Sequence, residues 1–251
     1  MRAILSDIHA NLEALQAVLA DAAQHGATEI YNLGDTVGYG PNPLECLALA
    51  QRFHLNLLGH IDHALLDEPE AFPDPLLQTL HWTLEALALM PDPTLGQRHI
   101  HFLTSLSSCH REGTTMYAHG SPRNPRHEYV FPEDIYNDSK MTRIGQAFDS
   151  LCFHGHTHIA GLFIHQSPEH WEYLDPGECP DGFAVAGRKV LCNVGSVGQP
   201  RDQDPRACYV LFDGATIRFR RVEYDVEATV RKIYDNEQIA NFLGDRLREG
   251  R

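Results

Sequence analysis

The chain has 251 residues, 43% of them hydrophobic, so it is long enough to bury one sizeable core. Its formal charge of −14 excludes a protein that binds nucleic acid through a general basic face. No run approaches the roughly 20 apolar residues of a membrane span, and the first residues lack the apolar stretch of a secretory signal. The six cysteines form no CxxC pair, which favours ordinary buried thiols over a disulfide framework. We therefore expect a cytoplasmic protein with a single domain over residues 1–251.

The first part of the chain alternates short apolar runs with helical patterns. Residues 2–6 predict a buried strand, and the apolar spacing after Asn11 predicts a helix that this residue caps and that stops near Gly26. The next expected elements are a strand, a helix and a strand, over residues 27–35, 44–53 and 54–59. This alternation with short connections predicts a parallel sheet with helices packed on it.

The rest of the chain changes pattern twice. Helices are expected over residues 75–90 and about 95–106, followed by strands over 114–120 and 151–158. From Gly161 onward, short strands broken by turns predict antiparallel hairpins and a second sheet. These strands are expected at residues 161–165, 170–174, 188–196, 207–214 and 216–224. The last segment, from Asp225 to Gly250, is expected to be helical.

Asp and His residues follow directly after five of the predicted strands. They are Asp7, His9, Asp35, His60, His119, His156 and His158. The carboxyl ends of strands in an open α/β sheet are where a ligand site forms. Carboxylate and imidazole groups without thiolate suit Mn, Fe, Zn, Co or Ni rather than a structural zinc site. One such pair is weak evidence, but five agreeing strand ends predict a metal site.

Five motifs, in order and spacing, resemble the calcineurin-like metallophosphoesterase superfamily. They are "SDIHAN" (6–11), "LGDTVGYGPNP" (33–43), "LLGHIDHALL" (57–66), "YAHGSP" (117–122) and "FHGHTH" (153–158). Residues 193–211 and 220–228 resemble the later part of a bacterial and archaeal branch commonly labelled phosphodiesterases, protein phosphatases or dinucleoside tetraphosphatases. The resemblance implies an α/β fold of four layers, α/β/β/α, in which two mixed sheets pack face to face with helices outside.

The resemblance also implies a dinuclear metal centre that hydrolyses phosphate esters with a metal-bridging hydroxide. Two ions roughly 3.5–4 Å apart activate water and hold a phosphoryl oxygen. Asp35 and Asp62 are predicted to act in catalysis, with Asp35 also bridging the two ions. By this resemblance the first ion takes Asp7, His9 and His158, and the second takes His60, His119 and His156.

The third motif departs from the family at two positions. The family usually has Gly-Asn-His-Asp, whereas this chain has Gly59-His60-Ile61-Asp62. His60 either replaces the amide ligand, which favours Fe, Zn, Co or Ni over Mn, or faces solvent beside a weak second site. Ile61 cannot protonate a leaving group, a step typically worth about 10²–10⁴-fold, so we expect a bias towards good leaving groups. His63 is either a replacement acid or a solvated residue at a helix start.

Arginines in two loops are candidates for substrate binding, because guanidinium groups match phosphate oxygens. Arg123 and Arg201 are the first choices, ahead of Arg126 and Arg206, although each is equally suited to a surface salt bridge. Tyr39 either lines the site or packs within its loop.

The leading function is that of a metal-dependent hydrolase acting on a small phosphorylated substrate such as a nucleotide, with phosphodiesters or phosphoanhydrides favoured. The alternatives are a phosphoprotein or phosphomonoester phosphatase and a non-catalytic scaffold with the same fold. A scaffold without catalytic demand loses ligands readily, so competent side chains at all seven positions favour the enzyme. The net charge and the lack of a basic aromatic surface disfavour a nuclease.

Overall fold

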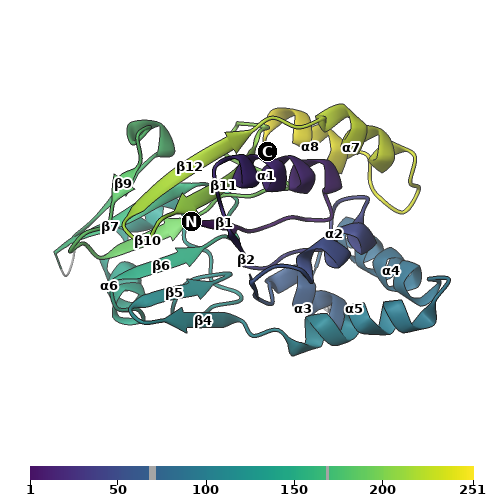
Figure 1. Cartoon of the computed structure of the whole chain (residues 1–251), viewed down its shortest axis with the longest axis horizontal. Coiled ribbons are helices and arrows are strands. Elements are labelled where there is room, and N and C mark those ends of the chain that lie inside the picture. Colours follow the sequence, from purple (N-terminus) through teal and green to yellow (C-terminus); the bar gives the residue numbers. More distant parts are fainter. Residues whose placement is uncertain (68–71, 168–169) are drawn as a thin grey trace.

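The computed structural model of the protein describes residues 1–67, 72–167 and 170–251. Two sheets lie against each other, with helices outside them and beyond one end of their strands (Figure 1). No helix within the described ranges combines the length and apolarity needed to cross a membrane. All six cysteines are free thiols and four are buried, which agrees with the sequence prediction except at Cys109 and Cys179.

The first sheet has the strand order β3-β2-β1-β11-β12-β9 in the described part of the chain. Strands β1, β2 and β3 are parallel, whereas β11 pairs antiparallel with β1, β12 with β11, and β9 with β12. The bounds are β1 Arg2–Leu5, β2 Glu29–Asn32, β3 Leu55–Asn56, β9 Phe183–Ala184, β11 Ala207–Phe212 and β12 Thr216–Val222.

The second sheet has the order β4-β5-β6-β10-β7-β8 across the described residues. Strands β5, β6 and β10 are parallel, and antiparallel strands lie at both edges. The bounds are β4 Cys109–Glu112, β5 Thr115–Ala118, β6 Leu151–His154, β7 Gly161–Ser167, β8 His170–Leu174 and β10 Val190–Asn193.

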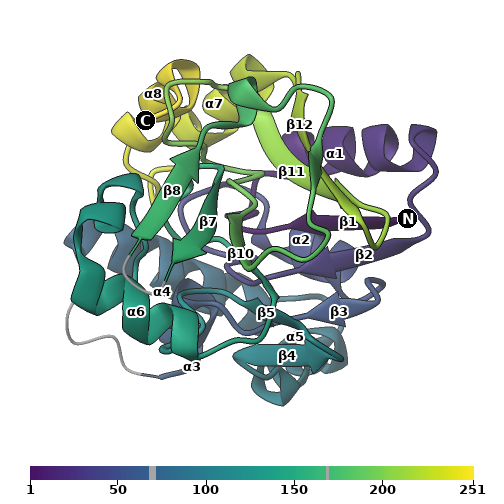
Figure 2. The same cartoon turned by 90° about the vertical axis from the view of Figure 1, so that its left-hand side faces the viewer.

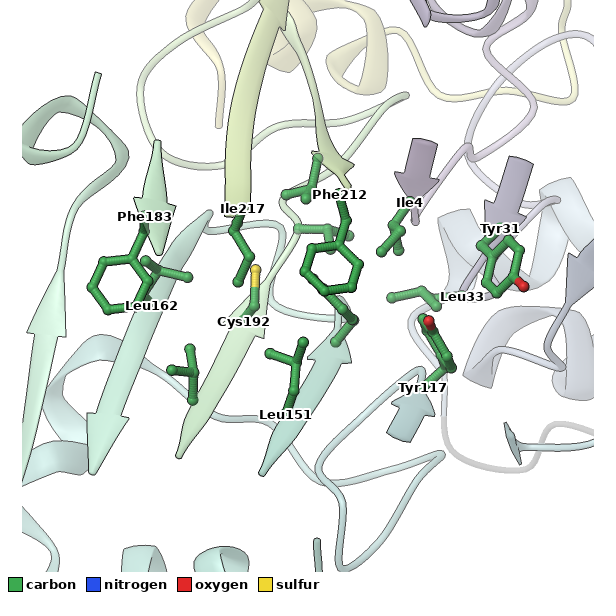
Figure 3. Packing of buried hydrophobic residues seen from close by; sticks show 14 of the residues in the cluster. Ile4, Tyr31, Leu33, Tyr117, Leu151, Leu162, Phe183, Cys192, Phe212 and Ile217 are labelled. Atoms are coloured by element: carbon green, nitrogen blue, oxygen red, sulfur yellow. The ribbon is translucent and has the colours of Figure 1, made fainter. Parts of the chain in front are cut away.

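The space between the sheets is filled by apolar side chains from both (Figure 3). Successive side chains of a strand point to opposite faces, so Ile4 lies in this layer while Ala3 and Leu5 pack outward. Phe153 of the second sheet lies edge-on to Phe212 of the first, with ring centroids 5.2 Å apart. The sheets are therefore joined by a continuous apolar layer.

Helices cover the outer face of each sheet. Helix α1 (Leu12–Gln24) packs on the first sheet, and α6 (Asp138–Gln146) packs on the second. Figure 2 shows α1 and α6 on opposite sides of the two sheets. The predicted four-layer α/β/β/α arrangement is confirmed.

The remaining helices gather beyond the carboxyl ends of the parallel strands, to the right in Figure 1. Helices α3, α4 and α5 share one apolar cluster, and α7 and α8 share another that also holds Tyr39. The bounds are α2 Pro43–Ala50, α3 His60–Leu66, α4 Asp74–Ala88, α5 Pro93–Ser105, α7 Val226–Tyr234 and α8 Phe242–Glu249, with short 3₁₀ turns at Pro132–Tyr136 and Pro176–Glu178.

Three expectations from the sequence need correction. The strands after Gly161 do not form a sheet of their own, because β9, β11 and β12 join the first sheet and β7, β8 and β10 join the second. The third strand is only Leu55–Asn56, and the last segment is two helices separated by residues 235–241. Alternation of apolar residues sets which face of a strand is buried and does not identify its partner strand. The cap at Asn11 is confirmed, since its Oδ1 accepts the N–H of Ala14 at 3.1 Å.

Candidate metal centre

Two groups of buried Asp and His side chains lie where the carboxyl ends of the two sheets meet. Within each group the potential ligand atoms all lie within 4.8 Å of one another. The first group draws on β1 and β6 and the second on β2, β5 and β6, so each combines strands of both sheets. The groups are Asp7, His9 and His158, and Asp35, His119 and His156.

In the first group, unprotonated imidazole nitrogen atoms of His9 and His158 face the carboxylate of Asp7. His9 Nδ1 lies 3.1 Å from the carbonyl oxygen of Val37, and His158 Nδ1 lies 2.6 Å from that of Gln199. A carbonyl only accepts, so each Nδ1 carries the proton and a neutral ring has its lone pair on Nε2. Burial and the nearby Arg201 lower the pKa of His158 to about 4, which keeps that ring neutral.

The Nε2 lone pairs of His9 and His158 converge on the carboxylate of Asp7. The Nε2 atoms of His9 and His158 are 3.1 Å apart and lie 3.7 Å and 3.2 Å from Asp7 Oδ1. That oxygen is buried and no described residue donates a hydrogen bond to it. Acceptors that converge without a donor repel one another, and a cation at their centre relieves this. The first group therefore fits a metal ion.

The second group is organised around Asp35. Its Oδ2 lies 3.3 Å from His119 Nε2 and 3.9 Å from His9 Nε2, so one oxygen reaches towards both groups. His119 Nε2 is 3.0 Å from His156 Nδ1, and His119 Nδ1 donates to the carbonyl of Leu33 at 3.2 Å. Asp35 Oδ2 therefore lies between the two groups.

Charges in the second group explain its protonation. Burial lowers the pKa of His119, but Asp35 outweighs this effect and raises it to about 9. Burial and the proximity of His119 lower the pKa of His156 to about 2. Burial raises the pKa of Asp35, yet His119 holds it well below the usual range. A proton on His119 thus lies between carboxylate and imidazole, and a cation held by these residues would displace it.

Backbone strain is concentrated at the same residues. Five of the six have a positive φ, a conformation that is uncommon for residues other than glycine and costs of order 1–3 kcal/mol each. The φ angles are 54° at Asp7, 47° at His9, 54° at Asp35, 71° at His156 and 63° at His158. Such strain persists only where the surrounding structure imposes it, and it accompanies functional sites.

Two glycines of the motifs allow the backbone to approach these carboxylates. A Cβ atom on Gly59 would lie 2.2 Å from Asp35 Oδ1, and one on Gly155 would lie 2.5 Å from Asp7 Oδ2. The N–H next to Gly155, that of His156, donates to Asp7 Oδ2 at 3.0 Å. Both motifs therefore need glycine for contact with the site and not for a turn alone.

His60 lies beside the second group without being part of its compact set of ligand atoms. It is the first residue of α3, and its ring centroid is 5.2 Å from that of His156. It also contacts the rings of Phe72 and His127, at 4.7 Å and 5.4 Å. Burial lowers the pKa of His60, so its imidazole is neutral and has a lone pair to offer.

The two groups open into a cavity of about 570 Å³. Its apolar side is formed by α3, α4 and the residues just before α4, and its polar side includes Tyr39 and Arg201. The side chain of Ile61 lines the cavity, while its backbone N–H donates to Asp35 Oδ1 at 2.7 Å. The apolar lining residues are Ile61, Ala64, Phe72, Pro73 and Leu76.

Asp62 is fully buried and holds the loop that carries Asp35. Its Oδ1 accepts the N–H groups of Thr36 at 2.8 Å and Val37 at 3.1 Å, and its Oδ2 lies 3.4 Å from the N–H of Gly59. Burial and the neighbouring Asp35 raise the pKa of Asp62 to about 6. Asp62 is not among the described residues that line the cavity, so its contacts are those of a positioning residue.

The two arginines favoured from the sequence have different surroundings. Arg201 lines the cavity and donates to Gln199 Oε1 at 2.7 Å. Arg123 pairs with Glu128 and is not among the described lining residues. Arg126 bonds to Ser108. His63 lines the cavity, as does Tyr39, whose ring lies 4.8 Å from that of His9.

Two lining residues, His127 and Tyr129, were not identified from the sequence. Tyr129 stacks on His156 with ring centroids 3.8 Å apart and an angle of 12° between the planes. His127 and Tyr129 follow His119 by eight and ten residues. The chain turns back after His119, because the N–H of Ser121 donates to the carbonyl of Glu128 at 3.0 Å. A turn signal in the sequence directly after the strand that leads to His119 is the feature that could have indicated these two residues.

Comparison with known proteins identifies the family. The model of the calcineurin-like phosphoesterase superfamily domain matches residues 1–216, and the chain belongs to that superfamily. A crystal structure of a metallophosphoesterase from Sphaerobacter thermophilus is 33% identical, with a TM-score of 0.83, over 100% of this chain and 98% of that one. This chain is a metal-dependent phosphoesterase.

Two further similarities concern the sequence and the fold. An uncharacterized protein of Methanocaldococcus jannaschii is 33% identical over 271 residues, covering 100% of this chain and 98% of its own. The structure of a hypothetical protein from Pyrococcus horikoshii OT3 is 21% identical, with a TM-score of 0.73 and coverage of 100% and 99%, and shows the same fold.

Replacing Asp62 separates positioning from direct catalysis. Asp62→Ala leaves buried N–H groups of Thr36 and Val37 without an acceptor, at about 1–3 kcal/mol each. We expect a clear drop in the urea midpoint of unfolding and weaker metal binding. Asp62→Asn keeps one acceptor oxygen and is expected to retain most of both properties and of activity. An Asn variant that is stable and binds metal yet is inactive would contradict the positioning role.

Proposed function

We propose that the chain hydrolyses phosphodiesters or nucleotide-type phosphoanhydrides at a two-metal centre formed by the two Asp and His groups. The observation that carries this proposal is that Asp35 Oδ2 lies between the groups, 3.3 Å from His119 and 3.9 Å from His9, at the base of one cavity. Bound metal ions of this kind activate water and neutralise charge on phosphoryl oxygens.

The residues of the chain act by holding and orienting the donor atoms. Val37 and Gln199 fix the rings of His9 and His158 through their Nδ1 protons, as the outer contacts of metal-binding histidines commonly do. Leu33 does the same for His119. Because the donors are set before substrate arrives, little reorganisation accompanies the reaction.

His60 completes the second group in this proposal. Its ring is next to that of His156 at the start of α3, and the charges of Asp35 and His119 act on it. The site then has three imidazoles and a shared carboxylate, so it is expected to prefer Fe, Zn, Co or Ni to Mn.

The apolar side of the cavity accounts for the preference for diesters and anhydrides. Ile61 presents a hydrocarbon surface where the family usually has a proton donor, and its neighbours Ala64 and Leu76 extend that surface. A leaving group that departs as a stable anion needs no proton, whereas a simple alkoxide does.

Hydrolysis of bis(p-nitrophenyl) phosphate tests the proposed function. Metal-loaded protein is expected to release p-nitrophenol, and Asp35→Asn is expected to lose at least about 10²-fold in rate because the shared carboxylate is gone. Glu223→Gln, on the surface after β12, is the matched control. No release with any of Mn, Fe, Zn, Co or Ni, or equal rates for Asp35→Asn and wild type, would contradict the proposal.

A series of aryl phosphodiesters tests the consequence of Ile61. We expect the rate to fall steeply as the pKa of the leaving phenol rises, because no acid stands at this position. Ile61→His should flatten the slope and speed the poorest leaving groups by about 10-fold or more, with Ile61→Leu as the packing control. A shallow slope in the wild type would show that another residue, such as His63, already supplies the proton.

A further inference from the structure

Gln199 is tied to the first metal group through both its backbone N–H and its carbonyl. The carbonyl accepts the Nδ1 proton of His158 at 2.6 Å, and the N–H donates to Ser196 Oγ at 2.9 Å. The Ser196 hydroxyl in turn donates to the carbonyl of Asp7 at 2.9 Å. Gln199 is only 1% exposed, so these bonds are shielded from water. Its position is therefore fixed relative to two residues of the first group.

The side chain of Gln199 holds the guanidinium of Arg201. Its Oε1 lies 2.7 Å from Arg201 Nη2 and 3.3 Å from Arg201 Nε. A guanidinium only donates hydrogen bonds, so the oxygen of the Gln199 amide, and not its nitrogen, faces it. The backbone N–H of Arg201 also donates to the carbonyl of His158 at 3.2 Å. The contact with Gln199 uses Nε and Nη2, and the N–H groups of Nη1 take no part in it.

Arg201 keeps its positive charge without a neighbouring carboxylate, although the chain has a net charge of −14. The acidic residues nearest to it in the sequence pair with other arginines, Asp202 with Arg221 and Asp204 with Arg206. Within the described ranges, none of the salt bridges involves Arg201.

The choice of an amide at residue 199 has a cost in contact strength. A carboxylate of the same length would form a stronger, charge-assisted contact with the guanidinium of Arg201. Holding the guanidinium alone would thus favour glutamate over glutamine. What the amide of Gln199 preserves is the positive charge of Arg201.

This charge lies in the wall of the cavity into which both groups open. Arg201 lines the cavity together with Tyr39, His9 and His158. Its guanidinium carbon is 5.9 Å from the ring centroid of Tyr39, and that centroid is 4.8 Å from the one of His9. Arg201 therefore borders the first group within the cavity.

We propose that Gln199 is a positioning residue that presents Arg201 to a phosphoryl oxygen of the substrate, and that residue 199 has to be neutral for this purpose. A guanidinium that is already oriented donates to an anionic oxygen with little reorganisation. With a neutral amide behind it, the charge of Arg201 is balanced by the bound anion alone. The inference rests on the proposed function, which places a phosphoryl group at the two Asp and His groups.

Gln199→Glu tests the need for neutrality, because it keeps the length of the side chain and its contact with Arg201. Titration calorimetry of the metal-loaded variant with inorganic phosphate is expected to show binding at least about 10-fold weaker than in the wild type. The urea midpoint of unfolding is expected to stay the same or rise, because the new contact is an ion pair. In hydrolysis of bis(p-nitrophenyl) phosphate, the expected change is mainly a rise in KM.

Two further variants separate the effect of Arg201 from that of added negative charge. Arg201→Gln removes the guanidinium and is expected to weaken phosphate binding to a similar extent. Gln203→Glu adds the same charge two residues beyond Arg201, on an exposed side chain, and is expected to bind phosphate as the wild type does.

The outcomes separate this inference from the proposed function. Unchanged phosphate binding in Gln199→Glu, an equal loss in Gln203→Glu, or no phosphate binding by the wild type would overturn the inference. A loss in Gln199→Glu together with a lower urea midpoint or metal content would also overturn it, because that result indicates a purely structural role. A protein whose phosphate affinity depends on residue 199 as expected, but that hydrolyses no diester, would support the inference while contradicting the proposed function.

Discussion

The structure depends on the convergence of buried oxygen and nitrogen lone pairs at the place where the two sheets meet. No group in the described part of the chain donates to Asp7 Oδ1, and the Nε2 atoms of His9 and His158 face it and each other within 3.7 Å. Such an arrangement is unfavourable in a protein without metal, because buried acceptors have lost their water. It becomes favourable when cations bind, so the fold is shaped around a ligand that its own side chains cannot replace.

The remaining architecture keeps these donors in place. Five strained backbone positions persist because each follows a strand anchored in the apolar layer between the sheets. Outer contacts, from the carbonyls of Val37, Gln199 and Leu33 and from the carboxylate of Asp62, orient the rings and the loop of Asp35. The backbone N–H of Ile61 donates to Asp35 and helps to orient it, although the Ile61 side chain supplies no acid.

Much of this site could be predicted from the sequence, because Asp and His after parallel strands must meet at one edge of a sheet. The partners of the later strands could not be predicted, because the alternation of apolar residues in β11 is the same whichever sheet this strand joins. Arg123 and Arg201 looked alike in the sequence, and only the neighbouring Glu128 and Gln199 distinguish them.

The central claim is that two metal ions bind and that His60 takes the place of the usual amide ligand. Elemental analysis of protein without a tag tests it most directly, since the chain has sixteen histidines and a tag adds more. The account predicts about two metal ions per chain in the wild type and about one in His60→Ala. One ion or none in the wild type, or two ions in His60→Ala, would contradict it.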